Sequence, residues 1–223
     1  MINRRQFLMS TSAALALGAL GSVGAFELFS GHGGRAEAET YSVLELEAKG
    51  QLDDIPLGSE SAPVTIIEYA SMTCPHCAAF ANEIFPKLKE KYIDTGKVRF
   101  IMRLFPTPPV QLSAAAYMLA RCAGPDKFYP MIETLFQMQA KWVVREPIQP
   151  LLGIARQAGF TQQSFDACLK DQAMLTKVQQ VAERGSTKFK VDSTPTFFIN
   201  GERHPGGMSI EEFDKIIAPL VKA

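Results

Sequence analysis

Short apolar runs with strand chemistry occur at three places along the chain. Residues 64–69 and 98–105 are rich in β-branched and aromatic side chains, and residues 196–199 form a third run of this kind. Continuous apolar runs of this length are typical of strands that are buried on both faces of a sheet. Asn200-Gly201, directly after the third run, is the strongest short hairpin signal in the chain.

Apolar residues at helical spacing fill most of the remaining chain. Phe80, Ile84, Leu88 and Tyr92 predict a helix after the first strand, and Pro86 should kink this helix or end its first half. No strand signal appears from about 111 to 186. Helical patterns there cover five segments: 112–122, 127–139, 148–158, 162–169 and 174–184.

The segments before the first strand and after the hairpin complete the order of elements. Residues 39–62 predict a loosely structured lead-in with a helical stretch near 43–48, and a capping box at 209–212 begins a final helix. The order is therefore β-α-β, a helical block, a β-hairpin and a helix. This order predicts an α/β sheet that carries an all-helical insertion.

The first 38 residues read as a targeting segment rather than as part of the fold. Arg4 and Arg5 precede an apolar stretch over 11–29, and a small-residue cleavage site ends at Ala38. The arginine pair resembles a twin-arginine export signal, although the general secretory route stays open. The alternative is an uncleaved membrane anchor, since the stretch is almost long enough to span a bilayer. We expect export, cleavage near Ala38 and a mature chain that starts near Glu39.

Composition narrows the classes of partner. The 223 residues contain 23 Lys and Arg against 23 Asp and Glu, so the formal net charge is zero. Nucleic-acid-binding proteins normally carry a basic excess, and we expect no nucleic acid as partner. Disulfides persist in the compartments that exported proteins reach, which changes how the four cysteines are interpreted.

Cys74-Pro75-His76-Cys77 lies where a predicted buried strand leads into a helix. Positions i and i+3 of a first helical turn lie about 5–6 Å apart, within the range that a disulfide tolerates. The helix N-terminus favours a thiolate at Cys74, and His76 can add a positive charge or a hydrogen bond. The alternatives are a static disulfide and half a zinc site. Zinc needs a second pair of ligands, and no other such motif is present, so we expect no metal.

Two distant features agree with redox chemistry. Thr194-Pro195 precedes the third strand, and a cis bond there would leave the Thr194 backbone free to pair with an extended peptide. The alternative is an ordinary trans proline at the start of a strand. Glu68 lies among apolar residues six positions before Cys74, where it could take the proton from Cys77 as a mixed disulfide resolves. Its alternative is an exposed acid on an edge strand.

These motifs together make the chain similar to the DsbA family, the thioredoxin-fold thiol:disulfide oxidoreductases of the bacterial periplasm. The resemblance covers roughly residues 55–222. It implies a nucleophile at Cys74, a resolving thiol at Cys77, a buried acid at Glu68 and a cis-proline loop at Pro195.

The resemblance also implies partners and a division into domains. The substrates are reduced exported proteins, and a DsbB-like, quinone-linked membrane oxidase restores the disulfide without a bound cofactor in this chain. We expect an export signal over 1–38, a thioredoxin-like domain over 39–106 and 187–223, and a helical insertion domain over 107–186.

Cys122 and Cys168 both fall in the helical block. In an oxidising compartment we expect them to be bridged, which would stabilise the fold by about 4 kcal/mol on the chain-entropy model. The alternative is two buried free thiols that pack as small apolar residues.

The Pro-His pair between the cysteines favours a disulfide donor, because stabilising the thiolate favours the reduced form of the protein. An isomerase or reductase on the same fold is the alternative, since Thr194 replaces the valine of the founding oxidase and is similar to the isomerase branch. A non-enzymatic metal-binding or chaperone-like module is a further alternative.

Overall fold

The computed structural model describes residues 39–221. The predicted export signal, its cleavage site near Ala38 and the alternative membrane anchor therefore lie outside the described residues. Within residues 39–221, no helix combines the length and the hydrophobicity needed to cross a bilayer.

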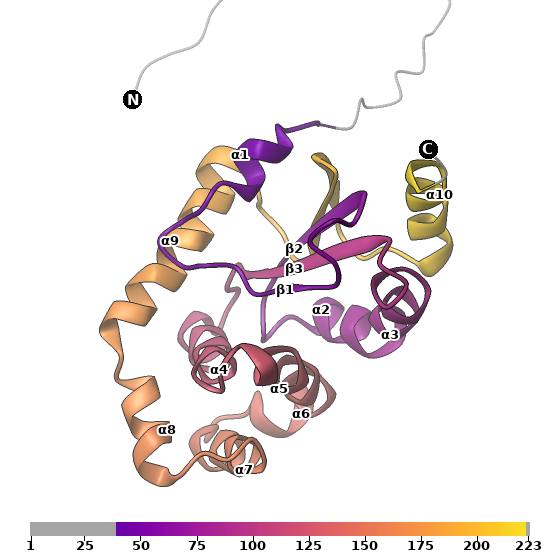
Figure 1. The fold of residues 1–223 in the computed structure, drawn as a ribbon. Coiled ribbons are helices and arrows are strands. Elements are labelled where there is room, and N and C mark those ends of the chain that lie inside the picture. Colours follow the sequence, from indigo (N-terminus) through magenta and orange to yellow (C-terminus); the bar gives the residue numbers. More distant parts are fainter. Residues whose placement is uncertain (1–38, 222–223) are drawn as a thin grey trace, which may run out of the picture. The chain divides into compact units, whose positions relative to one another are not determined.

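One mixed sheet forms the centre of the fold. Its strands are β1 (Pro56–Leu57), β2 (Val64–Ala70), β3 (Val98–Leu104), β4 (Thr196–Ile199) and β5 (Glu202–Pro205). They lie in the order β1-β3-β2-β4-β5, which places β2 in the middle (Figure 1). β2 and β3 run parallel, and the other neighbours are antiparallel. The three predicted strands are thus β2, β3 and β4, and the predicted hairpin joins β4 to β5.

Side chains alternate between the two faces of β2, and different helices cover the two faces. Ile66 packs with Phe80 and Phe213 on one face, whereas Tyr69 packs with Phe189 on the other. The first face is covered by a helical run over 75–93 and by α10 (Ile210–Leu220), and the second by α1 (Val43–Glu47) and α9 (Gln172–Phe189). Both faces are mostly apolar, because helices cover both.

The helical run after β2 is continuous but changes its winding. It consists of α2 (Pro75–Ala79), the π-helical turn η1 (Phe80–Ile84), α3 (Phe85–Leu88) and the π-helical turn η2 (Lys89–Ile93). Pro86 lies at the start of α3, directly after the first π-helical turn. Proline lacks an N–H and its ring clashes with the preceding turn, and the wider turn relieves both effects. The helix therefore changes register near Pro86 instead of ending there.

The helical block lies beside the sheet (Figure 1). It contains α4 (Val110–Cys122), α5 (Pro125–Gln137), α6 (Gln139–Trp142), α7 (Ile148–Gln157) and α8 (Gln162–Leu169), and α9 leads from it back to the sheet. The predicted domain boundary between 186 and 187 falls inside α9. The contact of α9 with β2 is tight at Gly185, where a Cβ atom would lie 2.7 Å from the ring of Tyr69.

The predicted loose lead-in is wrong in part. Its helical stretch is α1, whose Leu46 is buried, but Pro56 and Leu57 also add a strand to the sheet edge beside β3. A strand of two residues shows no alternation of side chains, so the hydrophobic pattern could not reveal it.

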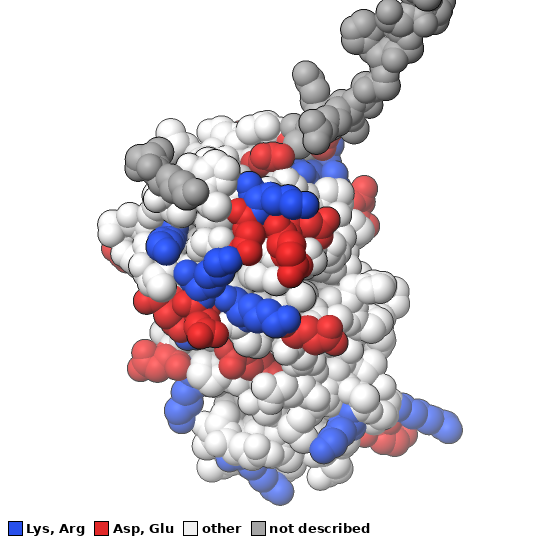
Figure 2. Space-filling view, turned by 90° about the vertical axis from the view of Figure 1, so that its right-hand side faces the viewer, with Lys and Arg blue, Asp and Glu red and all other residues white. Residues whose placement is uncertain are grey.

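Charged side chains of both signs are mixed on the surface. The face in Figure 2 shows Lys and Arg next to Asp and Glu rather than a field of one sign. Lys91 and Asp214, for example, form an ion pair of 2.7 Å. The surface agrees with the zero net charge of the sequence.

Candidate active site

Cys74 and Cys77 lie where β2 passes into the helical run, as the sequence predicts. Cys74 is the N-cap of α2 with an extended backbone, and Pro75 is the first residue of the helix. Both thiols are free, and the exposed fraction is 8% for Cys74 and 0% for Cys77. The structure therefore represents the dithiol form, with one sulfur near the surface and the other beneath it.

The two thiols have opposite acidities. The pKa of Cys74 is lowered from 9.0 to about 5, and the largest cause is a hydrogen bond from the Cys77 thiol. The Thr194 side chain and the backbone N–H groups of Cys77 and His76 lower it further, whereas partial burial opposes the shift. Burial is the main cause that raises the pKa of Cys77 far above its usual 9.0, and the charge of Glu68 adds to it. At neutral pH this pair holds one thiolate and one thiol.

The loop before β4 meets this sulfur. The Thr194–Pro195 peptide bond is cis, so the trans alternative is wrong. The carbonyl oxygen of Thr194 lies 3.4 Å from Sγ of Cys74, and the carbonyl oxygen of Pro195 accepts a hydrogen bond from the N–H of Gly206. Two segments 120 residues apart in the sequence thus meet at one sulfur atom.

Glu68 is buried in the central strand. It pairs in register with Met102 of β3 and Phe197 of β4, and only 3% of it is exposed. The alternative of an exposed acid on an edge strand is therefore wrong. Burial raises the pKa of Glu68 from 4.5 to about 8, and the charge of Cys74 adds to the shift. This carboxyl is largely protonated at neutral pH.

His76 is exposed on the first turn of α2. Its backbone N–H helps to lower the pKa of Cys74. Its side chain makes no hydrogen bond to any other residue of the described part of the chain, so the predicted role of the imidazole stays a prediction.

Known proteins are similar to this chain in sequence and in fold. The thioredoxin family profile matches residues 51–218. The crystal structure of alpha-DsbA1 from Wolbachia pipientis has a TM-score of 0.71 and 31% identity, with 76% of this chain and 91% of that chain covered. A probable disulfide bond formation protein D from Bacillus anthracis is 30% identical over 153 residues, which cover 65% of this chain and 69% of the relative. The chain belongs to the DsbA family.

Further comparisons support the same fold and family for this DsbA-family chain. BdbD from Bacillus subtilis, with 22% identity and a TM-score of 0.66, shares the thioredoxin-like architecture, so the predicted fold class is confirmed. A Rickettsia bellii protein, provisionally named a protein-disulfide oxidoreductase, is 34% identical over 169 residues, which cover 75% of this chain. The chain spans 55 to 63% of the length of the Rickettsia relatives that it matches.

Sequence reasoning missed the polar groups that hold the active-site loop. Gln139 at the start of α6 donates hydrogen bonds of 3.0 Å to the carbonyl oxygens of both Met72 and Cys74. Ser113 of α4 accepts a hydrogen bond from the N–H of Met72, and its hydroxyl lies 2.9 Å from that of Ser71. The helical block thus fixes the backbone on either side of Thr73. Isolated Gln and Ser residues carry no sequence signal for such a role.

The same hydroxyl cluster reaches the loop after β3. Thr107 donates to Ser71 through its N–H and its hydroxyl, at 3.0 and 2.9 Å, and its carbonyl oxygen accepts from the Thr73 hydroxyl. Buried hydroxyl groups that satisfy one another in this way hold a loop in one conformation.

The second pair of cysteines is bridged. Cys122 at the end of α4 and Cys168 in α8 form a disulfide, with their Cα atoms 6.2 Å apart. The alternative of two free thiols is wrong for this structure. Among residues 39–221, no three His, Cys, Asp or Glu side chains are grouped so as to hold a metal ion.

Proposed function

We propose that this chain is a thiol:disulfide oxidoreductase that donates a Cys74–Cys77 disulfide to reduced proteins. The observation that carries the proposal is the placement of Cys74 at the start of α2 beside the cis Thr194–Pro195 loop, with the Cys77 thiol buried beneath it. The opposite acidity of the two thiols agrees with this placement. A stabilised thiolate at Cys74 favours the reduced form, and a disulfide with this property is readily given up. The names of the Rickettsia and Bacillus relatives support the same activity.

The reaction has two exchange steps. A substrate thiolate attacks Sγ of Cys74, forms a mixed disulfide and breaks the Cys74–Cys77 bond. The sulfur of Cys77 leaves with the electron pair and takes a proton. A second substrate thiolate then attacks the substrate sulfur of the mixed disulfide, and Cys74 leaves as a thiolate. Two electrons have passed from the substrate to the protein, and the substrate holds a new disulfide.

Glu68 supplies the proton in the first step. Its carboxyl is largely protonated at neutral pH, and it lies close enough to Cys77 for the two groups to influence each other's titration. A leaving thiolate in a buried position gains most from a neighbouring general acid. When the disulfide is restored, the carboxylate takes the proton back from Cys77 before this thiol attacks.

The Thr194–Pro195 loop holds the substrate. The Thr194 backbone lies beside Cys74 and offers an extended peptide one strand-like pairing position. The exposed His76 adds positive charge near the same sulfur when it is protonated.

The proposal includes a location and a partner. We infer that the chain is exported to the periplasm, cleaved near Ala38 and reoxidised by a DsbB-like, quinone-linked membrane oxidase. Its substrates are reduced exported proteins. A disulfide between Cys122 and Cys168 supports an oxidising compartment, since such bonds persist there.

The test uses the oxidised protein and a reduced model peptide with two cysteines. We expect stoichiometric formation of the peptide disulfide, loss of this activity in Cys74→Ser, and a glutathione titration that places the protein among oxidants. A protein that leaves the peptide reduced contradicts the proposal. Refolding of a scrambled substrate with nonconsecutive disulfides separates the alternatives, because an isomerase speeds the repair and a donor alone does not.

A further inference from the structure

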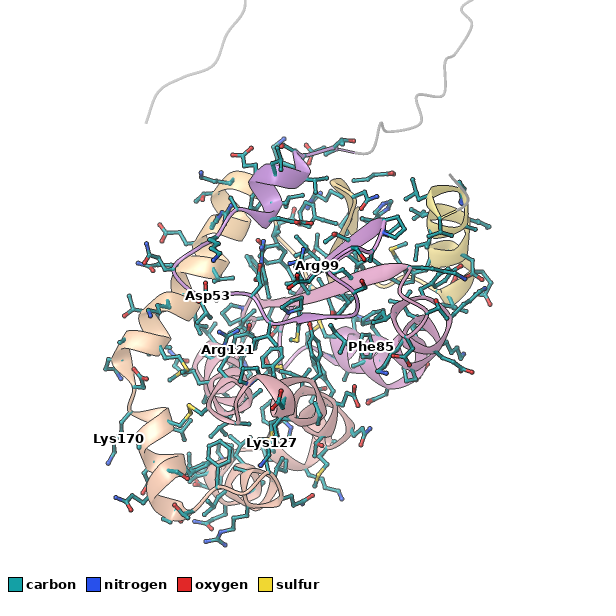
Figure 3. The ribbon with its side chains drawn as sticks, in the orientation of Figure 1. Asp53, Phe85, Arg99, Arg121, Lys127 and Lys170 are labelled. Carbon is teal, nitrogen blue, oxygen red and sulfur yellow. A yellow bond between two sulfur atoms is a disulfide. The ribbon has the colours of Figure 1, made fainter. Side chains whose placement is uncertain are left out.

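A small cavity adjoins Glu68 on the face of the sheet that the active-site helix covers. It has a volume of about 20 Å³, which is room for one water molecule. Figure 3 shows Phe85 beneath the sheet, and its ring is part of the cavity wall. The rest of the wall is mostly aromatic and aliphatic, and it includes Tyr129 and two acids, Glu68 and Glu133.

Glu68, which lines this cavity, has a side-chain oxygen without a hydrogen-bond partner. Among the described residues, Oε1 of Glu68 is one of four buried side-chain nitrogen and oxygen atoms without a hydrogen-bond partner. An unpaired buried oxygen is costly, and a water in a polar cavity is the usual way to satisfy it. An unpaired oxygen on a residue that lines the cavity therefore favours a water molecule there, which would meet the carboxyl groups of Glu68 and Glu133.

Glu133 is the second acid at the same cavity. It lies on α5 of the helical block and is half-buried, so its carboxyl has both the cavity and solvent within reach. Burial raises the pKa of Glu133 above 4.5, against the charge of Lys89. A carboxyl in this position exchanges protons with water more readily than one that is fully enclosed.

Tyr129 is the other ionisable side chain of the cavity wall, and its hydroxyl is already engaged. It donates to the carbonyl oxygens of Ile55 and Phe100 and accepts from the N–H of Met102. Burial also raises the pKa of Tyr129 well above 10.0. Tyr129 therefore does not carry protons at the pH at which Glu68 titrates.

We propose that Glu133 is the proton port of the active site, which passes protons between solvent and Glu68 through a water in this cavity. The inference rests on the proposed function, because Glu68 must be reprotonated after it has given its proton to Cys77. One proton moves from solvent to Glu133, from there to the water and on to the Glu68 carboxylate, and no electrons are transferred. The reverse path carries the proton out when the disulfide is restored.

The groups around Glu68 set the pH at which this path matters. Cys77 holds its proton across the working range, and Cys74 carries a negative charge only after reduction. Burial is the main cause that raises the pKa of Glu68, and the charge of a Cys74 thiolate, which exists only in the dithiol form, adds to it. Below this pKa the stored proton of Glu68 serves a single reduction. Above it the proton must arrive during the reaction.

The test is the single-turnover reduction of the oxidised protein by dithiothreitol, compared between wild type and Glu133→Gln. Effects of pH on the reductant cancel in the ratio of the two rates. We expect the wild-type rate divided by the Glu133→Gln rate to be near one at about pH 6 and to rise to about tenfold at about pH 9. This is less than the roughly 10²–10⁴-fold that a general acid or base itself supplies, because slow direct exchange continues in the variant. Raising the concentration of a small weak-acid buffer should restore part of the loss.

Two further variants complete the test. Asp126→Asn removes an exposed acid from the same helix and should match wild type at every pH. Glu133→Asp keeps the carboxyl and should restore most of the alkaline rate. A ratio that is independent of pH, or equal to that of Asp126→Asn, overturns the proposal, because a merely structural effect would slow the reaction equally at all pH values.

The outcome is separable from that of the proposed function. If wild type leaves the model peptide reduced but the dithiothreitol profile depends on Glu133, the donor function fails and the proton port stands. If the peptide is oxidised and Glu68→Gln loses the alkaline rate while Glu133→Gln does not, only the port fails.

Discussion

Replacing Glu68 with glutamine should make the protein less sensitive to alkali. The carboxyl lies in the central strand with one oxygen unpaired, and its pKa is raised from 4.5 to about 8. The folded state therefore binds this proton more tightly than the unfolded state does. Between these two pKa values the free energy of unfolding falls as the pH rises, because ionising the carboxyl is harder in the folded state. Glutamine keeps the shape and cannot ionise.

The size of the effect follows from the shift. One unit of pKa corresponds to about 1.36 kcal/mol. Glu68 should therefore remove about 3 kcal/mol from the free energy of unfolding at about pH 7 and about 5 kcal/mol once the pH exceeds 8. Cys74 acts with the opposite sign, since its pKa is lowered, but it is present in both proteins and cancels in the comparison.

Urea unfolding of the reduced proteins from about pH 4 to about pH 9 measures the difference. Trp142 is the sole tryptophan and is fully buried, so its fluorescence reports the transition. The free energy of Glu68→Gln minus that of wild type should grow by about 3 kcal/mol between pH 4 and pH 7. Glu83→Gln, an exposed control on the active-site helix, should add no slope. Parallel curves for Glu68→Gln and wild type would refute the reasoning.

Four other outcomes test the packing and the electrostatics. Gly185→Ala should destabilise the fold by about 1–3 kcal/mol, since its Cβ would lie 2.7 Å from a buried aromatic ring. Gly153→Ala, which meets no described atom within 4 Å, should instead stabilise by about 0.5–1 kcal/mol, and urea unfolding compares the two. Gln139→Leu removes two hydrogen bonds to the active-site backbone and should lower the free energy of unfolding by about 1–3 kcal/mol, unlike the exposed Gln137→Leu. Titration of thiolate absorbance in the reduced protein should give Cys74 a pKa of about 5, and a value near 9 would contradict the donors assigned to it.

The apolar pattern predicted most of the fold because both faces of the sheet are covered. β2, β3 and β4 match the predicted strands to within one residue at each end. The helix predicted over 174–184 continues to Phe189 in the structure. The sequence does not reveal this continuation, because Gly185 interrupts the apolar stripe where α9 packs against Tyr69. The π-helical turns were also beyond prediction, since an added residue per turn hardly changes the spacing of apolar side chains.

The candidate site, like the fold, was predictable from the sequence only in part. The positions of Cys74 and Cys77 at a helix start follow from a local motif, and that of Glu68 follows from one polar residue in an apolar run. Gln139 and Ser113 could not be found, because they bind the loop from 41 to 67 residues away and carry no motif. Such contacts depend on tertiary packing, which a single sequence does not display.

These missed residues indicate what the helical block contributes to the chemistry. Gln139 binds the carbonyl oxygen of Cys74 and Ser113 binds the N–H of Met72, so the block holds the backbone that leads into the donors that lower the pKa of Cys74. Glu133 comes from the same block and lines the cavity beside Glu68. A Cys-Pro-His-Cys motif on a helix supplies the reacting sulfur atoms, whereas the block fixes how firmly the thiolate is held and how Glu68 meets solvent. Redox properties should therefore respond to substitutions in α5 and α6 that leave the motif intact.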